Sequence, residues 1–268
     1  MVDAGRRNVL GILIDAVDYD AAVERIITAA KDGRPYSVSA LAVHGVMTGV
    51  LDEAHRRRLN EFDLVAPDGQ PVRWALNLLH GVKLRERVYG PTLMLNVCRR
   101  AADDGVPIFL FGGKQELLDK LAAKLTAKFP ALIIAGTRPS QFRKVTPEEA
   151  AATAAAIRDS GAKITFVGLG CPRQEVWTFE MRELLPMPLL AVGAAFNFHA
   201  GELDQAPPWL QARGLEWFYR FVKEPRRLWQ RYVLLNPLYV TLLTCQWLRL
   251  YSPQPNLDQP SPERIGYG

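Results

Sequence analysis

The chain of 268 residues carries 33 lysines and arginines against 28 acidic residues, and 49% of its residues are hydrophobic. This length and composition support a substantial core, in one large α/β domain or a domain with an appendage. Three widely spaced cysteines, Cys98, Cys171 and Cys245, exclude a disulfide-rich scaffold and indicate no zinc site. The apolar run before Asp15 is too short for a signal peptide, so we expect a reducing, cytoplasmic setting.

Strands and helices are predicted to alternate along most of the chain. The first helix follows Asp18 and Asp20, and helix capping explains this acidic pair better than a metal–nucleotide site does. The expected strands are residues 8–14, 36–43, 62–66, 106–113, 132–135, 164–167 and 189–192. Helices without long polar linkers separate them. This alternation predicts an α/β fold with a parallel sheet covered by helices on both faces.

Several polar residues stand at or near the ends of these strands. Ser39 lies within the second strand, and His44 follows it, at a position that lines clefts in doubly wound sheets or serves structure alone. Asp68 follows the third strand in the turn PDGQP, where it is either a cleft carboxylate or a turn former and helix cap. Arg87, just before the helix start at residues 90–92, either binds a phosphate there or is solvated.

Two of the strands end in glycine turns that lead into helices. One turn contains Gly112 and Gly113, and the other contains Gly168 and Gly170 and continues as CPRQE. Such a turn either makes a tight connection only or presents bare backbone N–H groups to phosphate oxygens. We take both turns as ligand-binding candidates. The residues that accompany the second turn as candidates are Pro172, Gln174 and Glu175.

Asn197 belongs to a third passage from strand to loop, GAAFNFHAG. The crossover rule for parallel strands places residues from five of these passages at one carboxyl edge of the sheet. These residues are Ser39, Asp68, Gly112, Gly168 and Asn197. We therefore expect a single cleft at that edge.

Two common nucleotide-binding motifs are missing from the chain. The dinucleotide pattern G-x-G-x-x-G begins at Gly168 and Gly170, but Arg173 occupies the place of the third glycine. No G-x-x-x-x-G-K-[ST] loop occurs either. An NAD- or FAD-dependent oxidoreductase is therefore disfavoured.

The composition changes after residue 206. Residues 207–232 are rich in tryptophan, tyrosine and arginine; Pro207-Pro208 is expected to open a helix and Glu224-Pro225 to interrupt it. Four arginines recur at helical spacing and approximately share one face: Arg213, Arg220, Arg227 and Arg231. This basic patch suits phosphate, a membrane surface or nucleic acid, with a solvated basic face as the alternative.

Residues 232–248 carry no charge and are interrupted by Asn236-Pro237. We interpret them as an interfacial membrane segment, with a helix of the soluble core or a true membrane span as alternatives. Residues 252–268 are rich in proline and serine and are predicted to be disordered. The expected units are therefore an α/β domain (1–206), a helical appendage that associates with a membrane (207–251) and a tail (252–268).

Six segments in order carry a resemblance: PDGQPVRW, FLFGG, VGLGCPRQEVW, VGAAFNFHAG, APPWLQARGLEW and YRFVKEPRRLWQRY. Over roughly residues 8–235 they resemble the WecG/TagA/CpsF family of bacterial glycosyltransferases. The resemblance implies a Rossmann-like α/β domain with a C-terminal appendage. It also implies inverting, metal-independent transfer of a sugar from a UDP-sugar to a polyprenyl-pyrophosphate-linked acceptor at the cytoplasmic face of the membrane.

The resemblance further implies roles for single residues. Asp68 matches the proposed catalytic base, and Gln174 matches a glutamine near the sugar site. Arg220, Arg227 and Arg231 match appendage arginines proposed to bind the acceptor's pyrophosphate.

One segment departs from the family's pattern. Ser39 stands where threonine is frequent, and Leu41 replaces the asparagine of the family's T-P-N segment. A polar contact to the sugar or the acceptor is thereby lost, and the identity of the donor sugar is left open.

Residue patterns and resemblance together give three expected sets. The catalytic residues are Asp68, Gln174, Arg220 and Arg227. The donor-binding residues are Ser39, Gly112, Gly113, Gly168, Gly170, Pro172, Gln174, Glu175 and Asn197. The acceptor-binding residues are His44, Arg87, Arg213, Arg220, Arg227 and Arg231.

No cofactor and no metal ion are expected, and a homo-oligomer is possible. The expected partners are a UDP-sugar, a polyprenyl-linked acceptor and the inner surface of the cytoplasmic membrane, and not nucleic acid. Two alternatives stay open: a UDP-sugar-binding regulatory or scaffold protein without turnover, and an α/β protein that binds nucleic acid with its arginine-rich segment.

Overall fold

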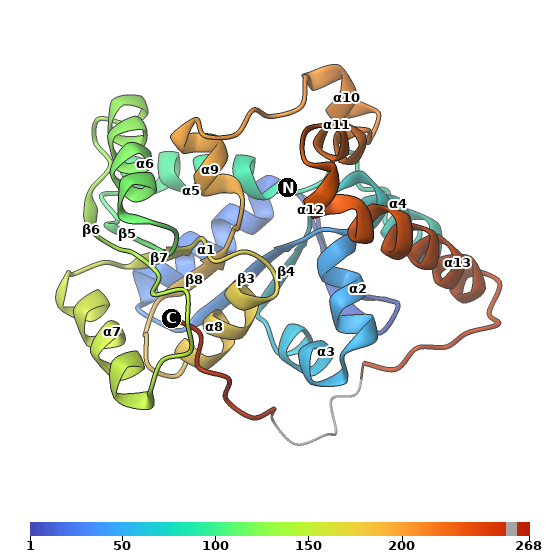
Figure 1. Ribbon diagram of the computed structural model, residues 1–268, viewed down its shortest axis with the longest axis horizontal. Helices are drawn as coiled ribbons and strands as arrows, with labels where there is room; N and C mark the ends of the chain where they lie inside the picture. The colour runs from blue at the N-terminus through green and yellow to red at the C-terminus, as the bar shows by residue number, and fades with distance from the viewer. Residues whose placement is uncertain (256–261) are drawn as a thin grey trace.

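The computed structural model describes residues 1–255 and 262–268, with all their side chains except those of Pro208, Ala212, Arg220, Arg227, Gln230 and Arg231. Six parallel strands form the central sheet in the order β4–β3–β8–β7–β5–β6 (Figure 1). The strands are β3 (Tyr36–Leu41), β4 (Leu64–Pro67), β5 (Ile108–Phe111), β6 (Ile134–Arg138), β7 (Ile164–Val167) and β8 (Pro188–Ala191). The parallel α/β sheet predicted from the sequence is confirmed, with strand ends shifted by a few residues.

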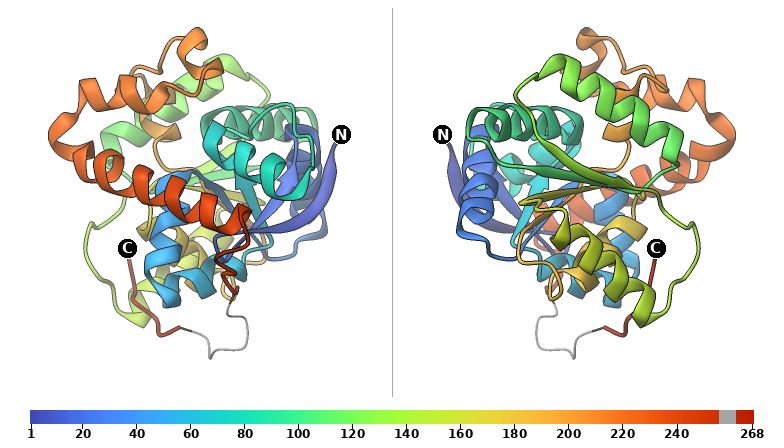
Figure 2. Two further views of the ribbon diagram at one scale, coloured as in Figure 1. Left: turned by 90° about the vertical axis from the view of Figure 1, so that its right-hand side faces the viewer. Right: turned by 90° about the vertical axis from the view of Figure 1, so that its left-hand side faces the viewer.

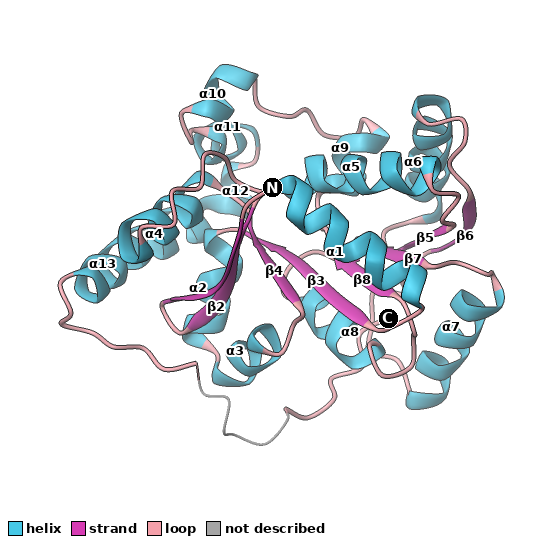
Figure 3. Cartoon of the chain, turned by 180° about the vertical axis from the view of Figure 1, so that it is seen from behind, coloured by secondary structure: helices cyan, strands magenta, loops and turns pink. Residues whose placement is uncertain are grey.

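Helices cover both faces of this sheet, which Figures 1 and 3 show from opposite sides. One face carries α1 (Tyr19–Asp32), α5 (Gly90–Asp103), α6 (Gln115–Lys128) and α9 (Ala195–Ala200). The other carries α2 (Val43–Leu51), α3 (Glu53–Asn60), α4 (Gln70–His80), α7 (Pro147–Asp159) and α8 (Arg173–Met181). Because successive strand residues point to opposite faces, Leu110 joins the first layer whereas Phe109 and Phe111 join the second.

The N-terminal segment is a hairpin, and the single strand predicted for residues 8–14 is wrong. β1 (Asp3–Val9) and β2 (Ile12–Val17) pair antiparallel, outside the six-stranded sheet. The turn between them has φ angles of 54° at Leu10 and 88° at Gly11. A two-residue hairpin turn of this kind needs positive φ at both positions, and leucine rarely adopts it. The sequence pattern therefore gave no turn signal at residue 10.

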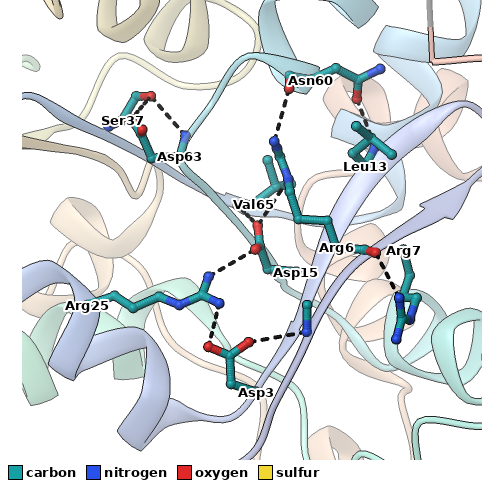
Figure 4. Close-up of polar contacts among 11 residues, drawn as sticks. Asp3, Arg6, Arg7, Leu13, Asp15, Arg25, Ser37, Asn60, Asp63 and Val65 are labelled. Atoms are coloured by element: carbon teal, nitrogen blue, oxygen red, sulfur yellow. Dashed lines mark hydrogen bonds and ion pairs between the residues drawn. The ribbon is translucent and has the colours of Figure 1, made fainter.

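Asp15 attaches this hairpin to the rest of the domain (Figure 4). Its side chain is 1% exposed, and its carboxylate accepts hydrogen bonds from the Val65 N–H at 2.8 Å and from Arg25 Nη1 at 3.0 Å. Arg6 Nε lies 3.7 Å from the same carboxylate. Burial raises the pKa of Asp15, although the Val65 N–H and both arginines oppose the shift. The hairpin is thus held against β4 by a buried, cation-paired carboxylate.

A succession of helices follows residue 206 and forms an arc along one side of the molecule (Figure 2, orange to red). They are α10 (Pro208–Ala212), α11 (Glu216–Lys223), α12 (Pro225–Trp229), the π-helix η1 (Gln230–Leu235) and α13 (Asn236–Trp247). As predicted, a helix begins at Pro208 and the chain is interrupted at Glu224-Pro225. We call residues 207–251 the appendage.

The appendage packs on the α/β domain through α13, which contacts α2 and α4. Tyr239 is 2% exposed, and its hydroxyl donates a hydrogen bond to the Pro71 carbonyl at 3.2 Å. Large apolar side chains nevertheless remain exposed on the appendage: Trp209, Phe218, Val222, Trp229, Val233, Leu234, Val240 and Trp247. Within the described residues, none of the helices combines the length and the apolar character that crossing a bilayer requires.

The described parts of the segment 252–268 contact the α/β domain, whereas composition predicts disorder for this segment. Asn8 Nδ2 donates to the Pro253 carbonyl at 2.8 Å, and Asn60 Nδ2 donates to the Pro255 carbonyl at 2.7 Å. Proline has no N–H group, but its carbonyl still accepts hydrogen bonds, and composition alone does not reveal such contacts. Residues 256–261 lie outside the described residues.

Candidate active site

A cavity of about 700 Å³ lies at the carboxyl edge of the sheet, and we call it the first cavity. Residues that end or follow each of the six strands line it: Ala40, Asp68, Gly113, Phe142, Gly168, Gly170 and Val192. Parallel sheets covered on both faces bind their ligands at this edge. Of the five residues expected at one cleft there, Asp68, Gly168 and Asn197 line this cavity, whereas Ser39 and Gly112 do not.

A second cavity of about 220 Å³ adjoins the first and is lined by both the α/β domain and the appendage. Its walls include His44 and Arg87 from the domain, and Trp217 and Tyr232 from the appendage. Five residues line both cavities: Ala40, Asp68, Tyr89, Cys171 and Gln174. We call these five residues the shared wall.

Asp68 is the carboxylate of the shared wall. It follows β4 directly; its N–H donates to the Leu41 carbonyl at 3.2 Å, and its Oδ2 accepts a hydrogen bond from the Gly90 N–H at 3.4 Å. The N-cap position of α4 belongs to Gly69, whose φ is 92°, so Asp68 does not cap this helix. Asp68 thus precedes the N-cap residue of α4 and lines both cavities.

Gln174, a residue of the shared wall, and Glu175, which lines the second cavity, lie in the first turn of α8. The Gln174 Oε1 accepts the Gly170 N–H at 3.2 Å, and its Nε2 donates to Glu175 Oε1 at 2.8 Å. Ser39 Oγ donates to the same Glu175 oxygen at 3.1 Å. Glu175 is 1% exposed and Ser39 is fully buried. Burial raises the pKa of Glu175, opposed in part by hydrogen bonds from Gln174 and Ser39.

The glycine turns supply fewer phosphate-binding amides than the sequence predicts. The N–H of Gly112 donates to the Arg138 carbonyl at 3.0 Å, and that of Gly168 donates to the Phe111 carbonyl at 2.8 Å. Since the Gly170 N–H is bonded to Gln174, three of the expected donors already have acceptors within the protein. A Cβ atom on Gly112 would lie 2.9 Å from backbone atoms of Gly168. Close packing of the two turns thus explains Gly112, whereas a Cβ on Gly168 would lie 2.4 Å from Phe196 Cδ2.

Two residues that line the cavities were not among the candidates from the sequence: Lys114 lines the first cavity, and Tyr89 lines both. Lys114 follows the first glycine turn, holds the N-cap position of α6, and is the cationic residue among the described residues that line the first cavity. A lysine directly after a glycine turn was the signal in the sequence that could have indicated it.

Asn197 lines the first cavity, as expected, and its Nδ2 donates to Glu202 Oε2 at 3.4 Å. Among the described residues, no group of three or more His, Cys, Asp or Glu side chains is placed to hold a metal ion.

Arg87 lines the second cavity and connects the domain to the appendage. Its guanidinium forms an ion pair with Glu216 of α11, lies 3.4 Å from Gln211 Oε1 and stacks over the Tyr89 ring at 4.3 Å. Arg87 is 8% exposed. Burial lowers the pKa of its guanidinium, but Glu216 and Asp68 outweigh this effect and raise it overall. The arginine expected to bind a phosphate thus pairs with a carboxylate at the cavity.

The other expected residues lie in different places. His44 lines the second cavity, and Pro172 holds the N-cap position of α8. Arg213 is exposed and stacks over Trp209, with 5.8 Å between its guanidinium carbon and the ring centre. The side chains of Arg220, Arg227 and Arg231 lie outside the described part of the structure.

Leu41, the departure from the family's pattern, is 1% exposed. A Cβ atom on Gly45 would lie 2.4 Å from Leu41 Cδ1, so the leucine packs closely against α2. Leu41 also lines the second cavity, so this position contributes an apolar, closely packed part of its wall.

A model of a known protein family matches most of the chain. The model described as "Glycosyl transferase WecG/TagA/CpsF family" matches residues 7–253. The match spans the six-stranded domain, both cavities and the helices of the appendage. The chain therefore belongs to the WecG/TagA/CpsF family of glycosyltransferases.

Proposed function

We propose that this glycosyltransferase moves a sugar from a UDP-sugar to a polyprenyl-pyrophosphate-linked saccharide, with inversion and without a metal ion. The observation that carries the proposal is the position of Asp68. Among the described residues, it is the carboxylate that lines both cavities, so it can meet one substrate from each side. The larger first cavity suits the nucleotide sugar, and the second suits the acceptor.

The reaction is a single displacement with Asp68 as general base. Asp68 takes the proton from the acceptor hydroxyl as its oxygen bonds to the anomeric carbon. The bond between that carbon and the diphosphate oxygen breaks, and UDP leaves with the bonding electrons. One displacement inverts the anomeric centre. Glu175 lines the second cavity, but it is 1% exposed and bonded to Ser39 and Gln174, so we do not assign it the role of a nucleophile that forms a covalent intermediate.

The leaving diphosphate needs positive charge beside the first cavity. Lys114 supplies it from the start of α6, where the helix dipole adds to the effect. This assignment replaces part of the role that the sequence gives to the backbone amides of the glycine turns.

The appendage supports the acceptor side of the proposal. Trp217 and Tyr232 place apolar rings at the second cavity, next to the Arg87 guanidinium. Aromatic and apolar side chains beside cations suit a polyprenyl chain that carries a pyrophosphate. We therefore propose that Arg220, Arg227 and Arg231, together with Arg87, bind that pyrophosphate at the inner surface of the cytoplasmic membrane during cell-surface polysaccharide synthesis.

Replacement of the proposed base tests the mechanism. Asp68→Asn keeps the size of the side chain but removes its basicity, so we expect transfer of radiolabelled sugar to fall at least about 100-fold. UDP affinity, measured by calorimetry, should stay within about threefold, because the contacts to the nucleotide come from elsewhere in the first cavity.

Asp159→Asn is the matched control, because Asp159 ends α7 and is exposed. It should transfer sugar at the wild-type rate. Unchanged turnover in Asp68→Asn would contradict the assignment of the base.

A further inference from the structure

Chemistry fixes the orientation of the Gln174 amide. A backbone N–H can only donate a hydrogen bond, so the Gln174 atom 3.2 Å from the Gly170 nitrogen must be its oxygen. The other end of the amide lies 2.8 Å from Glu175 Oε1, which suits the NH₂ group as donor. Both partners therefore select the same orientation, and neither fits a flipped amide.

This orientation decides which group Gln174 presents to a substrate. Its oxygen is bonded to Gly170, and one of its two N–H donors is used by Glu175. The second N–H is the remaining polar group of the amide, on a residue that lines both cavities. Gly193 leaves room for the amide, because a Cβ there would lie 3.0 Å from Gln174 Oε1 and 3.4 Å from Gln174 Nε2. Gln174 thus offers the shared wall a hydrogen-bond donor.

Glu175 is an unexpected residue for its environment. It is 1% exposed, and the groups that oppose its desolvation are hydrogen-bond donors, with no cation among the causes of its pKa shift. Burying a carboxyl group without an ion pair is costly, so an apolar residue would serve packing better here. Its bonds to Ser39 in β3 and to Gln174 in α8 indicate a role in alignment.

We propose that Glu175 is a positioning residue that holds the Gln174 amide with an N–H directed at an oxygen of the donor's sugar phosphate. The inference rests on the proposed function and adds to it the residue that orients the Gln174 N–H. Without Glu175, the Gly170 N–H still holds the amide oxygen, but the acceptor of one amide N–H is gone, so the direction of the second N–H is no longer fixed.

A double-mutant cycle tests whether Glu175 acts through Gln174. Full-length Glu175→Met, Gln174→Met and the double variant are assayed for sugar transfer, UDP affinity and thermal unfolding. We expect each single variant to lose about tenfold in kcat, the effect of one hydrogen bond, with UDP affinity within about threefold. The double variant should transfer no more slowly than Gln174→Met.

The conservative variant provides a rescue. Glu175→Gln keeps an oxygen that accepts the Gln174 N–H, and a neutral amide suits a site where burial already raises the carboxyl pKa. It should recover most of the activity that Glu175→Met loses. A second tenfold loss on adding Glu175→Met to Gln174→Met, or wild-type transfer by Glu175→Met alone, would overturn the inference.

An exchange variant covers the case in which Glu175→Met does not fold. Gln174→Glu with Glu175→Gln keeps a hydrogen bond between the two side chains but leaves no N–H donor at position 174. It should fold and bind UDP yet transfer sugar at less than about a tenth of the wild-type rate, and near-normal transfer would contradict the proposal. If instead the proposed function is wrong, the wild-type protein itself will fail to transfer sugar from any UDP-sugar.

Discussion

Lys114 lies where a departing diphosphate would need a counter-charge, directly after the Gly112–Gly113 turn. Lys114→Ala removes this charge while leaving the backbone of the turn in place. We expect kcat/KM to fall about tenfold, in line with one charge-assisted hydrogen bond, through a lower kcat for departure of the diphosphate and a higher KM for the UDP-sugar. Initial-rate kinetics at several donor concentrations measures the two effects separately.

Lys163→Ala is the control for this experiment. Lys163 is exposed just before β7, at the opposite edge of the sheet from the first cavity. Both kinetic constants should remain at wild-type values in that variant. An equal rise in KM for the two variants would show that general surface charge, and not Lys114, attracts the donor.

For single residues, the sequence predicted which ones lie at the carboxyl edge of the sheet better than it predicted their hydrogen-bond partners. Asp68 and Asn197 follow strands that the apolar pattern identifies, so their arrival at one edge follows from topology. The bond between Ser39 and Glu175 joins residues 136 positions apart, and no local pattern contains it. The same holds for the Gly112 and Gly168 amides, whose acceptors belong to neighbouring strands.

Among the secondary-structure elements, α11 is held against the α/β domain by the ion pair between Arg87 and Glu216. Both side chains are mostly buried, so removing one partner leaves a buried charge and costs about 3 kcal/mol of local stability. Arg87→Glu and Glu216→Arg should each increase hydrogen exchange in α11. The double exchange restores opposite charges and should restore the protection of the helix.

Sugar transfer separates docking from substrate binding in the same variants. If Arg87 also binds the acceptor's pyrophosphate, the double exchange should dock α11 but still transfer poorly. Recovery of transfer along with protection would limit Arg87 to docking. The exposed pair between Arg264 and Glu183, at 3.0 Å, is a matched control whose exchange should alter neither measurement.

The elements that the sequence predicted best are those with strong local signals. The capping box at Thr146 and Glu149 is such a signal and opens α7, and the interruption expected at Glu224-Pro225 falls between α11 and α12. The β1–β2 hairpin was missed because its turn uses Leu10 at positive φ. The ion pair that joins the appendage to the domain could not be predicted from local sequence either, because Arg87 and Glu216 are 129 residues apart.

Over the molecule as a whole, most of the large apolar side chains that are exposed lie on the appendage, which also contributes Trp217 to the second cavity. We expect the full chain to bind vesicles rich in anionic lipid and not to be retained on DNA at moderate salt. Phe218→Ser with Val222→Ser removes two side chains of α11 that are 52% and 63% exposed, and should weaken vesicle binding about tenfold.

Ile133→Ser is the matched control for vesicle binding. Ile133 is 49% exposed but lies beside β6 in the α/β domain, away from the appendage. Its replacement should leave co-sedimentation with vesicles unchanged. Retention on DNA without binding to vesicles would instead favour a nucleic-acid partner for the basic residues of the appendage.

The shared wall separates two spaces built from different parts of the chain: α6 and α9 border the first cavity, whereas α2 and α11 border the second. Neither substrate has to pass through the place of the other. If the substrates bind as we propose, both can be held in a ternary complex, and the spent nucleotide can depart while the lengthened lipid stays on the appendage. A product retained in this way would already be at the bilayer, where the enzyme that adds the next sugar would collect it.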